Sequence, residues 1–174
     1  MTSSGLFSYH QIEIEMGEQK QFAPTFQKVL APKVIDPAPP AAESEHGLEV
    51  AVVFTSAPAT IAALRKASAL ADRLSARIKL LVPQVVPFPL PLESPPVLLD
   101  FSERRFREIA AESPVETTVE IYLCRDRWET LKSVLARRSL VVIGGPKRWW
   151  PTKEKSMARK LGRAGHEVIF AETE

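Results

Sequence analysis

The chain has few of the residues from which covalent cross-links and metal sites are built. Its 174 residues include one cysteine, Cys124, and three histidines, His10, His46 and His166, that lie far apart in the sequence. A single cysteine forms no intrachain disulfide, and dispersed histidines lack the spacing of a metal site. We therefore expect no metal centre, no disulfide framework and a reducing compartment.

Long apolar runs and common catalytic motifs are also missing. No stretch approaches the roughly 20 apolar residues that a membrane-spanning helix needs, and the first residues lack the basic-then-apolar pattern of a secretory signal. Neither the nucleophile elbow G-x-S-x-G nor the phosphate loop G-x-x-x-x-G-K-[ST] occurs. These absences predict a cytoplasmic protein that has no membrane span, has no catalytic residues and is not an enzyme.

The composition that remains is that of one globular domain with a tail. Hydrophobic residues make up 45% and charged residues 25% of the chain, as in ordinary folded domains. Most of the 15 prolines fall in residues 24–40 and 83–96, which predicts a linker and a long loop. We expect a disordered or extended Pro-rich tail over residues 1–46, in which residues 11–16 alternate like an edge strand, and an α/β domain over residues 47–174.

Charge is distributed unevenly along the chain. Residues 1–46 carry three lysines against six acids, a net of −3, whereas twelve Lys or Arg residues between Arg125 and Arg163 face three acids, a net of +9. An anionic partner is therefore expected in the C-terminal half. One alternative is nucleic acid, whose binding would weaken steeply with salt.

Apolar strand-length runs alternate with segments of helical period from Leu48 onward. Strands are predicted over residues 48–54, 77–82, 115–124, 139–143 and 167–172, with Pro83 ending the second and Gly144-Gly145 ending the fourth. Asp126, with Glu129 three residues later, and Thr152 are predicted to cap two of the intervening helices. This order predicts a Rossmann-like five-stranded parallel sheet with helices on both faces.

The element order, the glycines after Val141-Val142-Ile143 and the closing helix before Val168-Ile169-Phe170 resemble a universal stress protein over residues 48–171. Members of that family that bind ATP have an aspartate after the first strand and G-x-x-G, then G-[ST] nine residues later. Glycines there let the backbone approach phosphates. The resemblance also implies a homodimer in which the last strand meets its copy.

This chain departs from the ATP-binding pattern at most of its positions. Phe54 stands where the aspartate is expected and is followed by Thr55-Ser56, while Lys147 replaces the second glycine. Gly144 and Ser156 match the pattern, but Lys155 precedes Ser156 instead of glycine. The resemblance therefore implies a member that uses no cofactor, with ATP or another nucleotide kept as an alternative.

The segment from Gly144 to Ser156 contains the candidate site. Its ligand-binding candidates are Ser56, Gly144, Gly145, Lys147, Arg148, Lys155 and Ser156. Lys153 joins Lys147, Arg148 and Lys155 around the expected helix start, where lysine and arginine can hold a phosphate as charges and hydrogen-bond donors. Trp149 and Trp150 are candidates for contact with a protein partner; filling of a vacated nucleotide cleft is the alternative. Cys124, beside Arg125, is interpreted as a partly buried structural cysteine.

The sequence thus predicts a non-catalytic regulatory or stress-response module. It would contact a partner or a small anionic molecule through residues 144–156. There are two alternatives. One is a nucleotide-using enzyme with an altered phosphate loop, which would need a general base or metal ligand near Gly144, and Asp126 and Ser56 are the candidates. The other is nucleic-acid binding.

Overall fold

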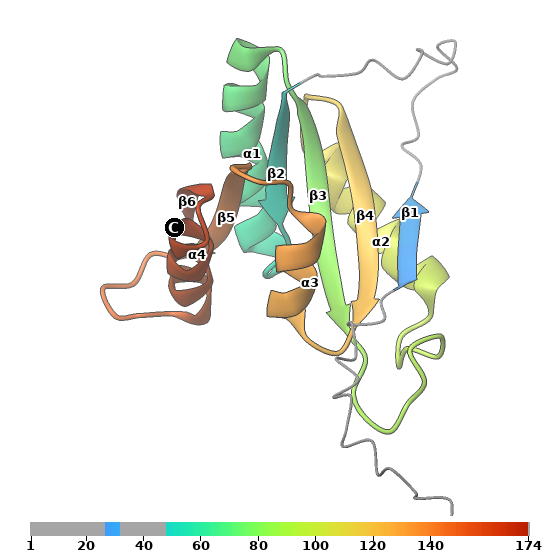
Figure 1. The fold of residues 1–174 in the computed structure, drawn as a ribbon. Coiled ribbons are helices and arrows are strands. Elements are labelled where there is room, and N and C mark those ends of the chain that lie inside the picture. The colour runs from blue at the N-terminus through green and yellow to red at the C-terminus, as the bar shows by residue number, and fades with distance from the viewer. Residues whose placement is uncertain (1–26, 32–47, 174) are drawn as a thin grey trace, which may run out of the picture.

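A computed structural model describes residues 27–31 and 48–173, with residues 27–31 described as backbone. The elements alternate between strand and helix after the first strand (Figure 1). Their bounds are β1 Gln27–Ala31, β2 Glu49–Val53, α1 Ala57–Leu74, β3 Arg77–Val85, α2 Leu99–Ala111, β4 Thr117–Cys124, α3 Arg127–Val134, β5 Leu140–Pro146, α4 Lys153–Arg163 and β6 Glu167–Thr173.

The strands form one sheet in the order β1-β4-β3-β2-β5-β6. The five strands from β2 to β6 are parallel, and their spatial order, taking β2 as the first, is third, second, first, fourth, fifth. This confirms the predicted Rossmann-like α/β fold. Parallel strands need crossover helices, and right-handed crossovers in opposite directions from β2 place helices on both faces.

Each face of the sheet packs on its own pair of helices. Val50 and Val52 of β2 point into a buried cluster shared with α1 and α2, where Leu64 and Phe106 lie. The alternate residues Ala51 and Val53 point into a second cluster under α3 and α4. The period of two along β2 therefore divides the core into two layers, with α1 and α2 on one side of the sheet and α3 and α4 on the other (Figure 1).

Strand β1 adds to the sheet a strand that the sequence did not predict. Residues 27–31, placed in the tail by sequence, pair antiparallel with β4 in a register that sets Gln27 against Leu123 and Ala31 against Val119. A short Val-Leu run between prolines is a weak strand signal, and it gains hydrogen bonds here because β4 would otherwise be an unpaired edge. Residues 11–16, the predicted edge strand, lie outside the described residues.

Two predicted strand ends were also wrong. β3 runs through Pro83 to Val85, although Pro83 was expected to end it. The carbonyl of Leu81 accepts a hydrogen bond of 2.9 Å from the amide of Phe54, so the backbone of Leu81 faces β2. Pro83 lies two residues further along β3, so its backbone faces the same side, at a point where β2 has already ended. An amide is not required there, and proline fits. β5 likewise continues through Gly144 and Gly145 to Pro146, because it still pairs with β6 as far as Thr173.

Candidate anion-binding groove

The crevice beyond the ends of β2 and β5 is where sheets of this topology usually bind ligands. In this protein, contacts between the segment that follows β2 and the end of β5 fill part of this crevice. The Thr55 hydroxyl donates a hydrogen bond of 2.9 Å to the carbonyl of Gly144. A Cβ added to Gly144 would lie 1.8 Å from the carbonyl oxygen of Ala59 in α1. The close approach that Gly144 permits is therefore to the first turn of α1.

Phe54 occupies the position at which the resemblance places an aspartate. Its ring packs edge-on against Phe106 of α2, with 4.8 Å between ring centroids and an interplanar angle of 75°. Phe54 is partly buried against the α1–α2 core cluster. The end of β2 thus contributes an aromatic contact to the core where a polar side chain would face a ligand.

The predicted glycine and serine candidates do not converge on one point. Gly145 lets α4 approach β5, because a Cβ there would lie 2.6 Å from the Phe170 ring and 2.9 Å from Cβ of Glu154. Ser56 is the exposed residue preceding α1, and its side chain makes no capping hydrogen bond. Gly144 and Gly145 consequently pack on two different helices, on opposite faces of the sheet.

Lys155 holds the loop that precedes its helix. Its ammonium group donates a hydrogen bond to the carbonyl of Arg148, lies 3.7 Å from a carboxylate oxygen of Glu172 and sits 5.7 Å from the centroid of the Phe170 ring. These three contacts fix the loop against β6. Lys155 was predicted to meet an anion, and its charge is already shared with Glu172.

The tryptophan loop, residues 147–152, presents both of its indoles to solvent. Trp149 is 88% exposed and Trp150 52% exposed, and their ring centroids lie 4.9 Å apart with a tilt of 39°. The two rings therefore contact each other and do not fill a cleft. Lys147 and Arg148 beside them are exposed, and no ion pair joins either to a described carboxylate.

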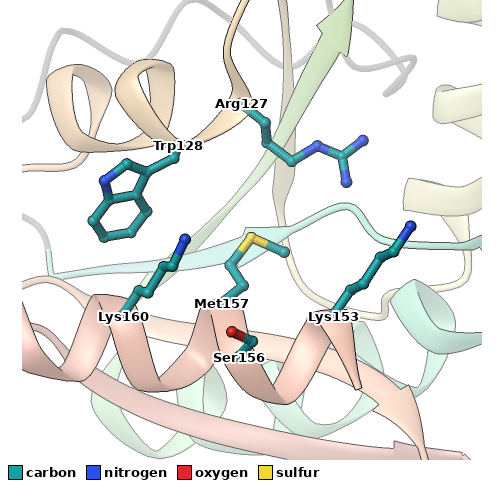
Figure 2. Close-up of a pocket in the computed structure, with 6 residues that line it drawn as sticks. All are labelled: Arg127, Trp128, Lys153, Ser156, Met157 and Lys160. Atoms are coloured by element: carbon teal, nitrogen blue, oxygen red, sulfur yellow. The ribbon is translucent and has the colours of Figure 1, made fainter. Parts of the chain in front are cut away.

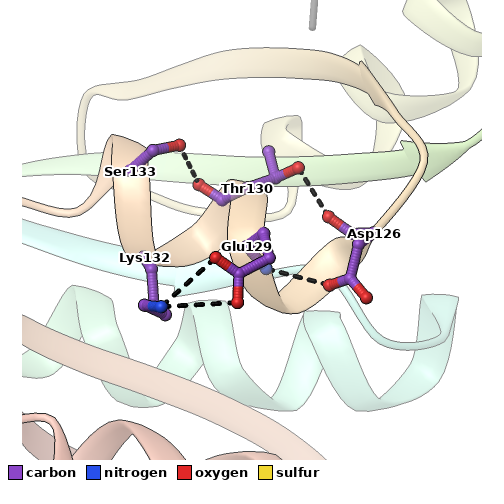
Figure 3. A network of polar contacts seen from close by, with 5 residues as sticks. All are labelled: Asp126, Glu129, Thr130, Lys132 and Ser133. Atoms are coloured by element: carbon purple, nitrogen blue, oxygen red, sulfur yellow. Dashed lines mark hydrogen bonds and ion pairs between the residues drawn. The ribbon is translucent and has the colours of Figure 1, made fainter. Parts of the chain in front are cut away.

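Helix α3 begins at the cap that the sequence predicts. The Asp126 carboxylate accepts a hydrogen bond of 2.9 Å from the amide of Glu129, and the Thr130 hydroxyl donates a 2.7 Å hydrogen bond to the Asp126 carbonyl (Figure 3). Glu129 then pairs with Lys132 at 3.2 Å. These bonds satisfy the first turn of the helix and orient Arg127 and Trp128.

Helix α4 begins at the other predicted cap, Thr152, whose hydroxyl accepts a 3.2 Å hydrogen bond from the amide of Lys155. Both helices start beyond the carboxyl ends of parallel strands and lie on the same face, so their first turns are side by side. Lys153, Ser156 and Met157 of α4 consequently face Arg127 and Trp128 of α3 (Figure 2).

Between these first turns lies a cavity of about 320 Å³, which we call the Trp128 pocket. Figure 2 shows the Met157 side chain rising between the helices, with the Arg127 guanidinium and the Lys153 ammonium at one end and Trp128 with Lys160 at the other. The Lys160 ammonium lies 5.8 Å from the Trp128 ring centroid. Six residues line the pocket: Arg127, Trp128, Lys153, Ser156, Met157 and Lys160.

The charge of this lining is unbalanced. Arg127, Lys153 and Lys160 belong to it, and no acidic residue of the described part of the chain does. None of the three forms an ion pair with another described residue. Three cations that share a partly enclosed space without a carboxylate attract an anion. The site therefore has the electrostatics of an anion receptor.

Sequence reasoning proposed two members of this lining for anion binding, Ser156 and Lys153. Arg127 and Lys160 were counted within the +9 segment but were not singled out as anion ligands, because their convergence with Lys153 depends on two helices being parallel and adjacent. The spacing of Arg127 and Lys153 along the chain carries no such signal. Leu131, on the same helix as Trp128, is buried, and Trp128 packs against the same cluster.

Cys124 lies at the end of β4, close to this pocket. Its side chain is fully buried, and its Sγ lies 3.6 Å from the carbonyl of Gln84. Burial raises the pKa of the thiol, an effect that outweighs the lowering by Thr130 and Arg127. The neutral thiol at physiological pH fits a structural cysteine.

A second polar cluster lies on the α3–α4 face of the sheet, toward its amino end. Lys79 lies 2.9 Å from a carboxylate oxygen of Glu49 and 3.6 Å from one of Glu120, and the Tyr122 hydroxyl donates to Glu120. Burial lowers the pKa of Lys79. The hydrogen bond to Glu49 and the charges of Glu49 and Glu120 together raise it by more than burial lowers it, so the net pKa lies above the ordinary value of a lysine. Burial and the bond to Glu120 raise the pKa of Tyr122.

Residues 27–31 and 48–173 contain no cluster of three or more His, Cys, Asp or Glu side chains arranged to hold a metal ion. Within the same ranges no helix combines the length and apolarity needed to cross a bilayer. Comparisons with protein-family models, with curated proteins and with solved structures each found no match to this chain.

Proposed function

We propose that this protein is a non-catalytic regulatory module that binds a small anionic ligand in the Trp128 pocket. The observation that carries the proposal is the group of three cations, Arg127, Lys153 and Lys160, which line the pocket with no acidic residue among the lining. A volume of about 320 Å³ lies at the small end of the usual range for ligand sites.

The lining also indicates the shape of the ligand. A guanidinium binds a phosphate or carboxylate through two parallel hydrogen bonds, and the Arg127 guanidinium lies at the same end of the pocket as the Lys153 ammonium. The indole of Trp128 and the thioether of Met157 offer an apolar surface beside them. A phosphate or carboxylate attached to a flat or apolar body fits this arrangement.

A universal stress protein-like role in the cytoplasm agrees with the fold and with the resemblance stated above. The contacts of Thr55 and Ala59 with Gly144, and the packing of Phe54 on Phe106, support a member that does not bind ATP in the usual manner of that family. The anion site would instead lie between α3 and α4.

Ligand-dependent thermal stability tests this function. The full chain is heated with millimolar inorganic phosphate, AMP, ATP or indole-3-acetate as separate probes. A ligand that binds only the folded state stabilises it by about 2.7 kcal/mol at one hundred times its Kd, so at least one probe should raise the melting temperature. Arg127→Ala and Lys153→Ala should each reduce that rise. The matched control is Arg104→Ala on α2, an exposed arginine on the opposite face.

Two outcomes would contradict the proposal. One is that no probe shifts the melting temperature. The other is a shift of the same size in wild type, Arg127→Ala and Lys153→Ala, which would place the anion elsewhere. Lys155→Ala is unsuitable as a probe of the site, because Lys155 supports the tryptophan loop through Arg148.

Contact of the tryptophan loop with a protein partner is a second candidate function, favoured by the exposure of Trp149 and Trp150. Exposed Trp beside Arg is typical of the residues that dominate binding energy in interfaces. A photo-crosslinking amino acid placed at position 149 in cells should yield one discrete adduct, whereas the same group at position 104 should not. Equal adducts at positions 149 and 104 would argue against the tryptophan loop as the contact site for a protein partner.

Homodimer formation through β6 is part of the same proposal. Among the described strands β6 pairs with β5 alone, so its outer edge has hydrogen-bonding groups for a second copy. Size-exclusion chromatography with light scattering should give twice the chain mass. A monomer mass at high protein concentration would contradict the dimer proposal and would not bear on the anion site.

A further inference from the structure

A second cavity lies between the other ends of α3 and α4. This His166 pocket has a volume of about 410 Å³ and is lined by Lys132, Leu135, Arg137, Arg138, Ala164, Gly165 and His166. Arg138 has a positive φ of 57°, in the turn between α3 and β5. The lining includes three Lys or Arg residues and, like the Trp128 pocket, no acidic residue.

The cations of the His166 pocket are also largely unpaired. Lys132 pairs with Glu129 at 3.2 Å, but neither Arg137 nor Arg138 forms an ion pair with a described residue. Nδ1 of His166 is buried and has no hydrogen-bond partner among the described residues. Because this nitrogen has almost no accessible surface, the charges that the pocket offers a ligand are those of Arg137 and Arg138.

The two pockets lie between opposite ends of α3 and α4, because the two helices start at the same edge of the sheet and run in the same direction. We call the surface from one pocket to the other the α3–α4 groove. Helix α4 has 11 residues, so its axis is about 16 Å long at 1.5 Å per residue. One small anion cannot contact both ends. Between the ends, Trp128 and Lys160 meet across the groove.

We propose that the α3–α4 groove binds a single-stranded nucleic acid, with backbone phosphates in both pockets and a base against Trp128. A chain of regularly spaced negative charges can neutralise the cations of both pockets at once, which no small ligand can. Cationic grooves with aromatic side chains on which bases stack are the usual means of binding single strands. This function goes beyond the small-anion site, because it requires the His166 pocket.

A single strand fits the groove better than the other polyanions. A duplex holds its bases stacked inside, so it would not use the half-buried indole of Trp128. An acidic protein segment would meet the cations but brings no flat base to the indole. The apolar surface between two cationic ends therefore favours unpaired nucleotides.

Fluorescence anisotropy of a labelled oligothymidylate of about twelve nucleotides, a usual site size, tests the proposal on the full chain across a salt series. Three double variants each remove two positive charges: Arg127→Gln with Lys153→Gln in the Trp128 pocket, Arg137→Gln with Arg138→Asn in the His166 pocket, and Arg104→Gln with Arg105→Gln on α2 as the matched control. Asn is chosen at 138 because it tolerates a positive φ.

Wild type should bind, with an affinity that falls as salt rises. Each groove variant should bind more weakly, and the slope of log K against log salt should decrease in magnitude by about 1.4, or 0.7 for each lost phosphate contact on a single strand. The α2 control, with the same net charge, should bind like wild type. Polyglutamate should compete poorly.

Four results would overturn the proposal: no binding of the oligonucleotide, equal weakening by the α2 control, an unchanged affinity in the His166-pocket variant, or efficient competition by polyglutamate, which would indicate an acidic protein. The small-anion function is tested independently of the nucleic-acid proposal. It depends on the cations of the Trp128 pocket, Arg127, Lys153 and Lys160, so the His166-pocket variant should keep its thermal shift with the small probes even if oligonucleotide binding is absent.

Discussion

Gly144 illustrates how a single residue can be required for a reason other than the one its motif implies. The glycine was predicted to admit a phosphate, yet an added Cβ would lie 1.8 Å from the Ala59 carbonyl oxygen. Gly144→Ala should therefore destabilise the protein by about 3 kcal/mol, at the upper end for overpacking, in urea unfolding.

Gly162, inside α4, is the matched control, because a Cβ there would meet nothing within 4 Å. Gly162→Ala should stabilise the protein by about 0.5–1 kcal/mol through helix propensity. Equal effects of the two substitutions would show that the contact between β5 and α1 is looser than described.

Cys124 should be unreactive in the native protein. Its full burial and raised pKa both reduce the thiolate that attacks electrophiles. A disulfide reagent such as Ellman's reagent should label the native chain only at the rate of unfolding and label one thiol per chain in denaturant. Rapid labelling of folded protein at neutral pH would mean that the thiol is accessible and activated.

Lys79 and Tyr122 should make the fold sensitive to alkaline pH. Both have folded pKa values above the ordinary 10.5 and 10.0, so the unfolded chain loses these protons first as pH rises. The stability they contribute is complete below about pH 10 and is lost above it. The melting temperature should fall between neutral pH and about pH 11, and Tyr122→Phe should flatten that fall. An equally steep fall in the variant would exclude Tyr122 as a cause.

The candidate site shows which residues a sequence can and cannot identify. Trp149 and Trp150 were recognised from the sequence as unusual, since two adjacent indoles in a loop cannot easily both be buried. Lys155 and Gly144 were singled out by motif, and their observed contacts are with Arg148, Glu172 and Ala59. Arg127 and Lys153 meet only because α3 and α4 lie side by side, and that adjacency is set by the whole sheet.

Helix α3 is short enough for its cap to matter. It has eight residues, and isolated helices of that length are unstable in water. Asp126→Ala removes the acceptor for the Glu129 amide and should cost about 1 kcal/mol of stability. Asp126→Asn keeps an oxygen at that position and is the matched control.

The same substitution should weaken ligand binding in the Trp128 pocket, because Arg127 and Trp128 belong to the first turn of the helix that Asp126 caps. In Asp126→Ala the thermal shift given by the small anionic probe should decrease more than in Asp126→Asn. If calorimetry showed equal stability for both variants and wild type, the hydrogen bond from Glu129 would be contributing little.

At the level of elements, the four helices and the five parallel strands that the structure describes in residues 48–173 were predicted from periodicity and caps. Continuous apolar runs such as Val50-Ala51-Val52-Val53 are buried on both faces of the sheet, and that is a strong signal for a parallel strand. The ends were less predictable: β3 continues through Pro83 because β2 has stopped beside it, and β5 continues through Gly144 because β6 still pairs with it. That information lies in the partner strand and not in the local sequence.

On the scale of the whole molecule, β1 covers the edge of β4 that the parallel sheet leaves unpaired. A chain lacking residues 1–31 should expose that edge and associate, since unpaired edges accept strands from other molecules. A chain lacking residues 1–26 keeps β1 and is the matched control. Light scattering should show larger species for the first truncation alone; identical masses would mean that β1 does not protect the edge.

The positions of the three tryptophans give the molecule two separate optical signals. Trp149 and Trp150 are exposed and touch each other, whereas Trp128 lines the groove beneath Lys160. Acrylamide should therefore quench mainly the emission of the loop pair, and a stacked base should quench mainly that of Trp128. The unlabelled protein can thus report occupancy of the groove and of the loop in one cuvette, and close coupling of the paired indoles should give a near-ultraviolet circular dichroism band that changes only when the loop is engaged.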